Sequence, residues 1–298
     1  MSTGRATVGL EISNSLIEHL RRGVGRLQML PPLAKEAMEI VNTDDCDLLK
    51  VASIIQRDVK LATFILRVAN STAFSPPKPI ASLNHAVLFI GRRRARDFII
   101  TASLMALSNT VPASLHTRQA TLASHGFLTA VMATKINHLL KLGFDGEEFT
   151  AGLMHDFGRT LMMIADPVNT PHIDPLDFNE PVGIEGRERL HLGASHAEIG
   201  AWFAATNELP DSLVSAIRFH HAPEEAGDGL MMAALISAAD HAVNDMQRSD
   251  ARAGYDPATN RGILLLEQSG VPDASGRFAS AIDVLRKDVV EAAQSFQS

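Results

Sequence analysis

His155 and Asp156 interrupt an otherwise apolar run that extends from residue 151 to residue 164. A neighbouring imidazole and carboxylate supply nitrogen and oxygen donors from one point on the backbone, which is a compact half-site for a divalent metal ion. The apolar residues around the pair predict a buried helix or two abutting helical turns. A buried ionisable pair needs partners, because an unpaired buried charge is costly. The alternative is that the two side chains only hydrogen-bond to each other and to nearby backbone.

Further histidines and one more aspartate lie within, or at the ends of, other apolar segments rather than on solvated faces. Five segments that each deliver an imidazole or a carboxylate inward are more than chance satisfaction of core polar atoms predicts. A shared metal pocket accounts for the pattern better, since these groups are typical transition-metal ligands. The predicted pocket contains His125, His155, Asp156, His196, His220, His221 and Asp240.

The composition predicts a soluble, all-α protein. Its 298 residues are 46% hydrophobic and 20% charged, which excludes wholesale disorder, and the aromatic content of 5% favours helix over sheet. The formal net charge of −7 gives no global field that favours nucleic acid. The chain has no apolar run of membrane-spanning length and no signal-peptide pattern. Because the single Cys46 cannot form an internal disulfide, we expect a cytoplasmic protein.

Apolar periodicity, helix caps and proline or glycine breaks predict helices throughout the chain, without strands or repeats. Ser195 and Glu198 match a capping box, which puts His196 in a first helical turn. We expect an N-terminal bundle at 8–110, a metal-site core at 113–246, and a linker with C-terminal helices at 247–298. The expected helices are 8–22, a helix from the prolines at 31–32 through 41, 48–56, 60–69, 82–90, 93–107, 114–142 with one break, 147–164, 185–192, 196–206, 210–221, 229–246, 261–268 and 277–294.

Arg92, Arg93, Arg94 and Arg96 form a basic cluster at the expected start of the 93–107 helix. The helix macrodipole disfavours cations at this end, so the placement indicates an anion or an acidic partner. A solvated face or internal ion pairs explain the cluster more simply, because a charge run alone is a weak signal. These four arginines and Arg159 are the candidate residues for binding an anion or a partner.

Blocks of the first half resemble the HDOD family of bacterial signalling proteins, which is related to the HD phosphohydrolase superfamily. The blocks are Leu30-Pro-Pro-Leu33, Ile54-Ile-Gln-Arg-Asp58, Leu66-Arg-Val-Ala-Asn-Ser71 and Pro79-Ile-Ala-Ser-Leu-Asn-His-Ala-Val-Leu-Phe-Ile-Gly91. The ordered histidines and aspartates of the second half are similar to the metal-site signature of that superfamily. The resemblance extends from about residue 27 to about residue 245 and covers most of the chain.

The resemblance implies an N-terminal helical bundle packed on an HD-like helical core, and a regulatory rather than a hydrolytic role. It also implies one or two divalent transition metals as cofactors, and the ligand types suit Fe, Mn, Zn or Ni. The alternative is a metal-free histidine cluster tied by hydrogen bonds. By the superfamily pattern, His125, His155, Asp156 and Asp240 hold a first ion, Asp156 bridges, and His196, His220 and His221 hold a second.

The chain departs from the cyclic-di-GMP phosphodiesterase branch of the superfamily at three places. No Gly-Tyr-Pro segment follows His221, and Arg159 stands where that branch has a lysine. Thr121, one turn before His125, cannot supply the extra carboxylate that trinuclear members use. A third ion is therefore not expected.

Three functions are consistent with these features. The first is a non-enzymatic signalling module that binds a partner protein or a nucleotide messenger such as cyclic di-GMP. The second is a metal-dependent phosphohydrolase or phosphodiesterase acting on a nucleotide, in which two cations activate a bridging water. The third is a nucleic-acid-binding regulator that uses the arginine cluster, which the acidic balance disfavours. We expect the first function and no membrane association, while the oligomeric state and the role of residues 247–298 stay open.

Overall fold

The structure is a computed structural model that describes residues 12–24, 32–71, 74, 76–178, 183–207, 209–248 and 254–297. These residues form helices and connecting turns without a strand, which confirms the all-α prediction. The α-helices are α1 (Asn14–Val24), α2 (Pro32–Val41), α3 (Leu48–Ile55), α4 (Val59–Asn70), α5 (Leu83–Met105), α6 (His116–Leu140), α7 (Glu147–Met154), α8 (Phe157–Ala165), α9 (Thr170–Ile173), α10 (Ile184–Leu192), α11 (His196–Thr206), α12 (Asp211–Phe219), α13 (Leu230–Gln247), α14 (Arg261–Gln268) and α15 (Ala274–Gln297). None of the described helices has the length and apolarity needed to cross a membrane.

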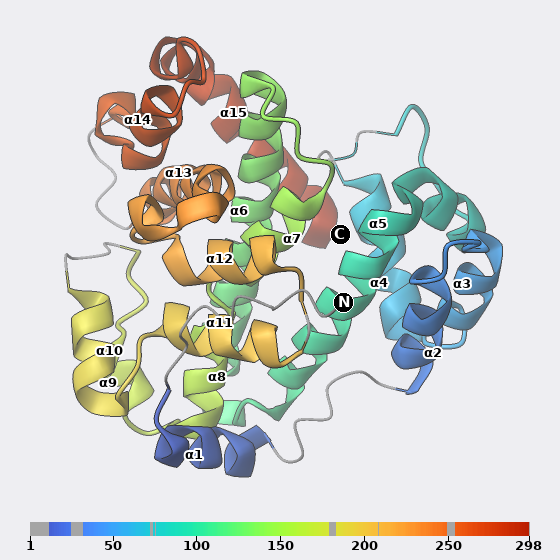
Figure 1. The fold of residues 1–298 in the computed structure, drawn as a ribbon, viewed down its shortest axis with the longest axis horizontal. Helices are drawn as coiled ribbons and strands as arrows, with labels where there is room; N and C mark the ends of the chain where they lie inside the picture. Colours follow the sequence, from blue (N-terminus) through green and yellow to red (C-terminus); the bar gives the residue numbers. More distant parts are fainter. Residues whose placement is uncertain are drawn as a thin grey trace, which may run out of the picture.

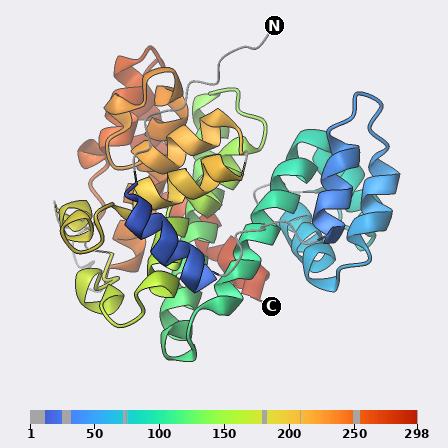
Figure 2. The same cartoon turned by 60° about the horizontal axis from the view of Figure 1, so that its bottom comes forward.

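Helices α2–α5 form a lobe that stands beside the rest of the molecule (Figures 1 and 2). Within this lobe, α5 packs against α2, α3 and α4, and it also contacts α7 of the larger body. The larger body is built around α6, which contacts α7, α13 and α15. All seven predicted metal ligands belong to this larger body.

The first and last helices both pack on the larger body. Helix α1 contacts α8, and the His19 Nε2 group donates a hydrogen bond to the carbonyl oxygen of Ala165 at 2.7 Å. Helix α14 contacts α13, and α15 contacts α6. An ion pair of 2.8 Å joins Lys135 of α6 to Asp288 of α15. The C-terminal helices therefore dock on the metal-site half, while the three predicted domain limits stay a prediction.

Polar side chains explain two of the sequence blocks of the first lobe. The Asp58 carboxylate accepts hydrogen bonds from the backbone N–H groups of Lys60 and Leu61 at 3.0 and 3.1 Å, which caps the start of α4. The Asn70 amide, in the last turn of α4, accepts from the Ile80 N–H at 2.7 Å and donates to the Ile80 carbonyl at 2.8 Å. Asn70 thereby holds the segment before α5 against the end of α4.

Gly91 divides α5 into the two helices that the sequence predicts at 82–90 and 93–107. Its φ of 77° and ψ of 173° are not helical, and glycine adopts this region without steric cost. The arginine cluster occupies the turn that follows this kink.

The expected break within 114–142 is wrong, because α6 is continuous from His116 to Leu140. Gly126 lies inside α6 at a close helix contact, where an added Cβ would be 2.9 Å from the carbonyl oxygen of Leu153. This glycine permits close packing of α7 and does not interrupt α6. The 147–164 stretch is two helices, α7 and α8, which meet at the His–Asp pair. Parts of two expectations, residues 8–11 and 30–31, lie outside the described residues.

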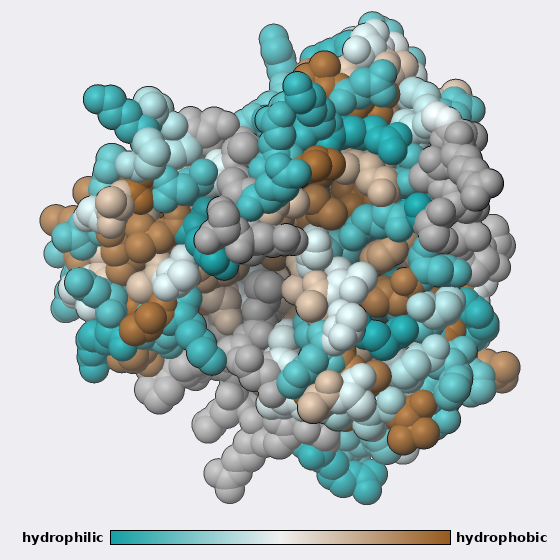
Figure 3. All heavy atoms as spheres, turned by 180° about the vertical axis from the view of Figure 1, so that it is seen from behind, coloured by the Kyte–Doolittle hydropathy of each residue, from teal (hydrophilic) through white to brown (hydrophobic). Residues whose placement is uncertain are grey.

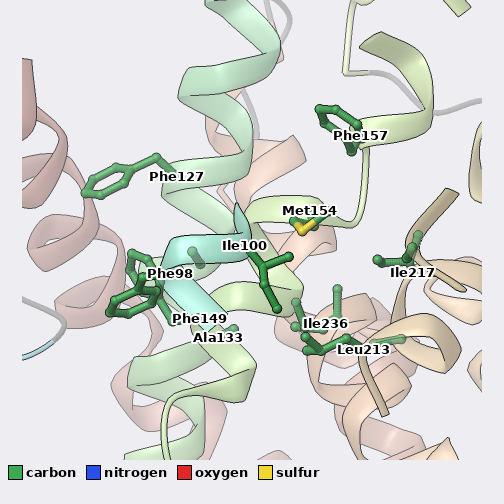
Figure 4. Close-up of a cluster of buried hydrophobic side chains, with 14 of the residues drawn as sticks. Phe98, Ile100, Phe127, Ala133, Phe149, Met154, Phe157, Leu213, Ile217 and Ile236 are labelled. Atoms are coloured by element: carbon green, nitrogen blue, oxygen red, sulfur yellow. The ribbon is translucent and has the colours of Figure 1, made fainter. Parts of the chain in front are cut away.

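Buried aromatic side chains join the two lobes. The ring of Phe98 on α5 lies 5.6 Å from that of Phe149 on α7, and Phe149 lies 6.2 Å from Phe127 on α6. Both pairs are edge-to-face, the arrangement that the ring quadrupoles favour. Figure 4 shows buried apolar side chains from this interface to Met154 and Phe157, the residues on either side of the His–Asp pair. The predicted ligands therefore sit at the edge of a hydrophobic core.

The surface is mostly polar on the face shown in Figure 3, where apolar residues appear in separate groups. Scattered exposed apolar residues are normal in globular proteins. The most exposed of the described large apolar side chains come from different elements and are Val59, Val168, Leu190 and Val284. The buried polar cluster is therefore the feature that calls for a functional explanation.

Candidate metal centre

The seven predicted ligands lie together inside the larger body. They come from five helical segments. Five of the seven lie at helix ends, where a side chain can project away from the packing face of its own helix. Six are buried and His221 is half-buried. His125 lies on α6, His155 and Asp156 lie between α7 and α8, His196 begins α11, His220 and His221 follow α12, and Asp240 lies on α13.

A first group surrounds Asp240. The Oδ1 atom of Asp240 lies 3.0 Å from His125 Nε2 and 3.5 Å from His155 Nε2. The two Nε2 atoms are 3.2 Å apart. The Asn244 amide, one turn along α13, donates a hydrogen bond of 3.0 Å to the same Asp240 oxygen. These side chains present two imidazole nitrogens and a carboxylate to one point.

A second group consists of three histidines from α11 and the end of α12. His196 Nε2 lies 3.4 Å from His220 Nε2 and 3.0 Å from His221 Nε2. No carboxylate other than that of Asp156 belongs to this group of potential ligands among the described residues. The second group is therefore richer in imidazole and poorer in negative charge than the first.

Asp156 lies between the two groups and faces each with a different oxygen. Its Oδ2 atom lies 3.7 Å from His125 Nε2 and 3.6 Å from His155 Nε2. Its Oδ1 atom lies 3.3 Å from His196 Nε2 and 3.7 Å from His220 Nε2. Both oxygens are buried and lack a hydrogen-bond partner in the described part of the chain. A carboxylate in this setting is placed to bridge two cations.

The outer nitrogens of the imidazoles show which atoms are available as ligands. His155 Nδ1 lies 2.7 Å from the Gly152 carbonyl oxygen, and His220 Nδ1 lies 2.8 Å from that of Ile217. Carbonyl oxygens only accept, so each Nδ1 carries the proton and each neutral ring keeps a lone pair on Nε2. The Nε2 atom of His155 lies 3.2 Å from that of His125, and the Nε2 atom of His220 lies 3.4 Å from that of His196. An outer-shell carbonyl on Nδ1 is the usual partner of a metal-bound histidine.

Charge within the cluster agrees with metal ligation. Burial disfavours a charged His196, but the Glu188 carboxylate outweighs this effect and raises the pKa of His196 to about 9. Burial, reinforced by His155 and His196, lowers the pKa of His220 to about 3. Burial opposes a charged Asp156, yet Arg159 and the histidines hold its pKa well below the usual value. Asp156 is thus a carboxylate and His220 is neutral, as metal binding requires, whereas a cation that binds His196 must displace a proton.

Gly158 allows Asp156 and His196 to approach each other. An added Cβ at Gly158 would lie 1.9 Å from the His196 carbonyl oxygen and 3.0 Å from the Gly200 nitrogen. The obstacle is backbone of α11, which cannot rotate away as a side chain can. The predicted capping box of Ser195 and Glu198 is present and fixes the start of the same helix.

Gly158→Ala is therefore expected to lower the free energy of unfolding by about 3 kcal/mol, the upper end of the usual cost of overpacking. Urea denaturation followed by circular dichroism measures this change. Gly186→Ala is the matched control, because Gly186 is exposed on α10 and an added Cβ there meets nothing within 4 Å. The control is expected to change stability by less than about 1 kcal/mol and in the favourable direction. Equal effects of the two substitutions would contradict the close approach of α8 and α11.

Arg159 lies beside the Asp156 carboxylate rather than in solvent. Its guanidinium is buried, with Nε 3.3 Å from Asp156 Oδ1 and a terminal nitrogen 3.9 Å from Asp174 Oδ2. Asp174 is itself buried. Because Arg159 is engaged with two carboxylates, an incoming anion would compete with both of them.

The arginine cluster lies in a different setting. Arg94 forms an ion pair with Asp145, Arg96 pairs with Asp97 at 3.0 Å, and Arg92 donates to the Thr43 carbonyl oxygen at 3.0 Å. Arg93 is exposed. Internal ion pairs, the simpler explanation of the cluster, therefore hold for two of the four arginines, and a binding role stays a prediction.

The residues that contact the candidate ligands on the side away from the centre were not identified from the sequence. Glu188 and Gln247 contact the Nδ1 atoms of His196 and His125, at 2.7 and 2.6 Å. Glu188 lies between Ile184 and Leu192 at helical spacing, so a carboxylate on the apolar face of α10 was a usable signal. Phe178, whose ring stacks on His125 with centroids 5.0 Å apart, carries no such signal.

The HDOD domain model matches residues 27–223 of the chain. An uncharacterized protein of Treponema pallidum (strain Nichols) is 25% identical over 209 residues, which make up 67% of this chain. The chain spans only 40% of the length of that relative.

Solved structures share the fold over nearly the whole chain. An HDOD domain protein of unknown function from Geobacter sulfurreducens has a TM-score of 0.70 at 22% identity, covering 93% of this chain and 97% of that one. A candidate metal-dependent phosphohydrolase from Shewanella amazonensis SB2B has a TM-score of 0.66 at 18% identity, covering 95% and 96%. A candidate signal transduction protein from Marinobacter aquaeolei VT8 has a TM-score of 0.62 at 16% identity, covering 98% and 68%. At these identities the similarity establishes the fold alone.

Proposed function

Because the chain belongs to the HDOD domain family, we propose that it is a non-enzymatic bacterial signalling module whose histidine–aspartate centre holds divalent transition metal ions. The observation that carries this proposal is the Asp156 carboxylate. Its two buried oxygens lack hydrogen-bond partners among the described residues and face two separate groups of imidazole nitrogens. A hydrogen-bonded core cluster would leave neither oxygen unsatisfied.

Each group of ligands would hold one ion. His125, His155 and Asp240 would bind the first, His196, His220 and His221 the second, and Asp156 both. The ligand types suit Fe, Mn, Zn or Ni. Bound ions would offset the buried negative charge of the two aspartates and tie together the segments that carry the ligands. The rigidity of the larger body would then depend on metal occupancy, which is a physical basis for regulation.

Enclosure of the centre supports a binding or sensing role over turnover. Asp156 is 5% exposed and Asp240 is 6% exposed. The Phe178 ring stacks on His125 and is itself buried. A catalytic metal needs an open coordination position for substrate, whereas a structural or sensing metal does not.

Metal-dependent phosphohydrolysis of a nucleotide is the second candidate function, and the complete set of seven ligands favours it. A two-ion centre supplies an activated water for attack on phosphoesters when the ions are bound. Purified protein loaded with Mn²⁺ should be assayed with cyclic dinucleotides, (p)ppGpp and bis(p-nitrophenyl) phosphate. The signalling proposal expects no turnover above that of a His155→Ala variant. Hydrolysis at enzyme-like rates would replace the first function with the second.

Removal of the metal is expected to destabilise the protein. Free Zn²⁺ at about 100 times its dissociation constant would add about 2.7 kcal/mol per site, which raises Tm by roughly 4 °C per site. Scanning calorimetry with and without EDTA measures the shift. His155→Ala should abolish the share of the shift that comes from the first ion, while His138→Ala, which changes an exposed histidine of α6, should keep the whole shift. A Tm that stays constant after the metal has been removed would contradict the proposed role of the ions.

The partner remains part of the proposal. We propose a cytoplasmic protein that binds either a signalling protein or a nucleotide messenger such as cyclic di-GMP. The exposed Arg92 and Arg93 are the basic groups that such an acidic ligand would meet, whereas the buried Arg159 would bind an anion only in competition with Asp156 and Asp174. Nucleic acid is not the proposed partner, because the net charge is −7 and Arg94 and Arg96 are paired with aspartates.

A further inference from the structure

Glu188 differs from the groups that contact the outer nitrogens of His125, His155 and His220. Its side chain is completely buried on α10. Both carboxylate oxygens lie against His196 Nδ1, at 2.7 and 2.9 Å, and one of them also accepts the backbone N–H of His196 at 2.9 Å. The outer nitrogens of His125, His155 and His220 contact only neutral oxygens, from an amide side chain and two carbonyls. Among His125, His155, His196 and His220, His196 is therefore the one backed by a charged partner.

The two groups of ligands differ in negative charge, and Glu188 lies beside the group that has less. The first group has the carboxylate of Asp240 in addition to the shared Asp156. The second group has three imidazoles and only the shared carboxylate. A divalent ion in the second group would meet less negative charge than one in the first. Glu188 supplies the missing charge through the His196 ring.

The element that carries Glu188 is anchored to the ligand helix. Arg189, the next residue of α10, donates from Nε to Glu198 Oε2 of α11 at 3.1 Å. The same Glu198 oxygen accepts from the Ser195 N–H within the capping box, at 2.7 Å. Helix α10 is thus tied to the first turn of α11, and this tie holds Glu188 behind His196.

From this arrangement we propose that Glu188 is a positioning residue that holds His196 with its proton on Nδ1 and strengthens metal binding in the second group selectively. The inference rests on the proposed metal centre and adds the group that tunes one of its two sites. A carboxylate on the outer nitrogen fixes the tautomer and ring orientation and makes the ligand more basic. Loss of such a partner typically weakens metal affinity 10- to 100-fold.

The test is Glu188→Gln, which keeps the size of the side chain and removes its charge. Zn²⁺ affinities are measured by competition with a chromophoric chelator, and stoichiometry by elemental analysis after dialysis. We expect wild-type protein to bind two ions, and the variant to bind one with unchanged affinity and the other about 10- to 100-fold more weakly. Glu148→Gln is the matched control, because Glu148 is an equally buried glutamate that bonds Gly146 and Asn137 instead of a ligand. It should leave both affinities unchanged.

A second measurement does not depend on the variant folding. In Zn²⁺-loaded wild-type protein labelled with ¹⁵N-histidine, His196 should show a protonated Nδ1, a metal-bound Nε2 and the most downfield ring N–H proton of the ligand set. An unprotonated His196 Nδ1, or equal affinities in Glu188→Gln and wild-type protein, would overturn the inference but leave the metal centre in place. Parallel weakening of both sites would also overturn it, because the effect would not be selective. Wild-type protein that binds no Zn²⁺ would remove the proposed centre and this inference together.

Discussion

Asp156→Asn is expected to empty both metal sites at once. The carboxylate is shared, with one oxygen 3.3 Å from His196 Nε2 and the other 3.6 Å from His155 Nε2. Asparagine is of similar size but has no negative charge and only one oxygen donor, so neither ion keeps its anionic ligand at this position. We expect the affinity for each Zn²⁺ to fall by at least about 100-fold, the upper end of the loss seen for outer-shell partners.

Elemental analysis after dialysis against a weak chelator measures the Zn²⁺ content of the Asp156→Asn protein. Asp97→Asn is the matched control, since Asp97 is a buried aspartate of α5 that pairs with Arg96 outside the centre. The control protein should keep its full metal content. If Asp156→Asn retained one ion with wild-type affinity, the carboxylate would not bridge the two groups.

Arg159→Met is expected to cause the largest loss of stability in the metal-free protein, about 3–5 kcal/mol. Methionine fills much of the same space, but it leaves the buried carboxylates of Asp156 and Asp174 without the guanidinium that lies 3.3 and 3.9 Å from them. Breaking a buried ion pair by removing one partner is costly because the other charge stays buried. Urea denaturation of EDTA-treated protein gives the free energy of unfolding.

Arg57→Met provides the comparison for a surface arginine. Arg57 pairs with Glu36 at 3.0 Å, but both side chains are exposed, so its replacement should cost at most about 1 kcal/mol. Similar losses for the two substitutions would show that Arg159 does not compensate buried charge at the centre.

The seven candidate ligands could be picked out from the sequence because their side chains are chemically conspicuous, and their role as metal ligands stays a prediction. Histidines and aspartates are uncommon within or at the ends of apolar segments unless they have a partner. The structure brings all seven into two adjoining groups. Helix breaks were predicted where a local residue decides them. Gly91 divides α5 as expected, whereas α6 continues through Gly126, which lies in close contact with α7.

The residues that contact the outer nitrogens of the ligand histidines could not be predicted from the sequence, because these contacts depend on which helices become neighbours. Glu188 stands eight residues before His196, but the contact between them needs α10 to fold back on α11. Gln247 reaches His125 across 122 residues of sequence. The packing of α1 on α8 could not be predicted for the same reason. The amphipathic pattern of α1 indicates that one face is buried but not which helix covers it.

The most direct test of the two-ion centre is a crystal structure of the protein grown with Mn²⁺, with anomalous difference density calculated at the centre. Two peaks should appear, one on each side of the Asp156 carboxylate, the first within reach of His125, His155 and Asp240 and the second within reach of His196, His220 and His221. Fully ordered side chains at these positions with no anomalous peak beside Asp156 would contradict the account.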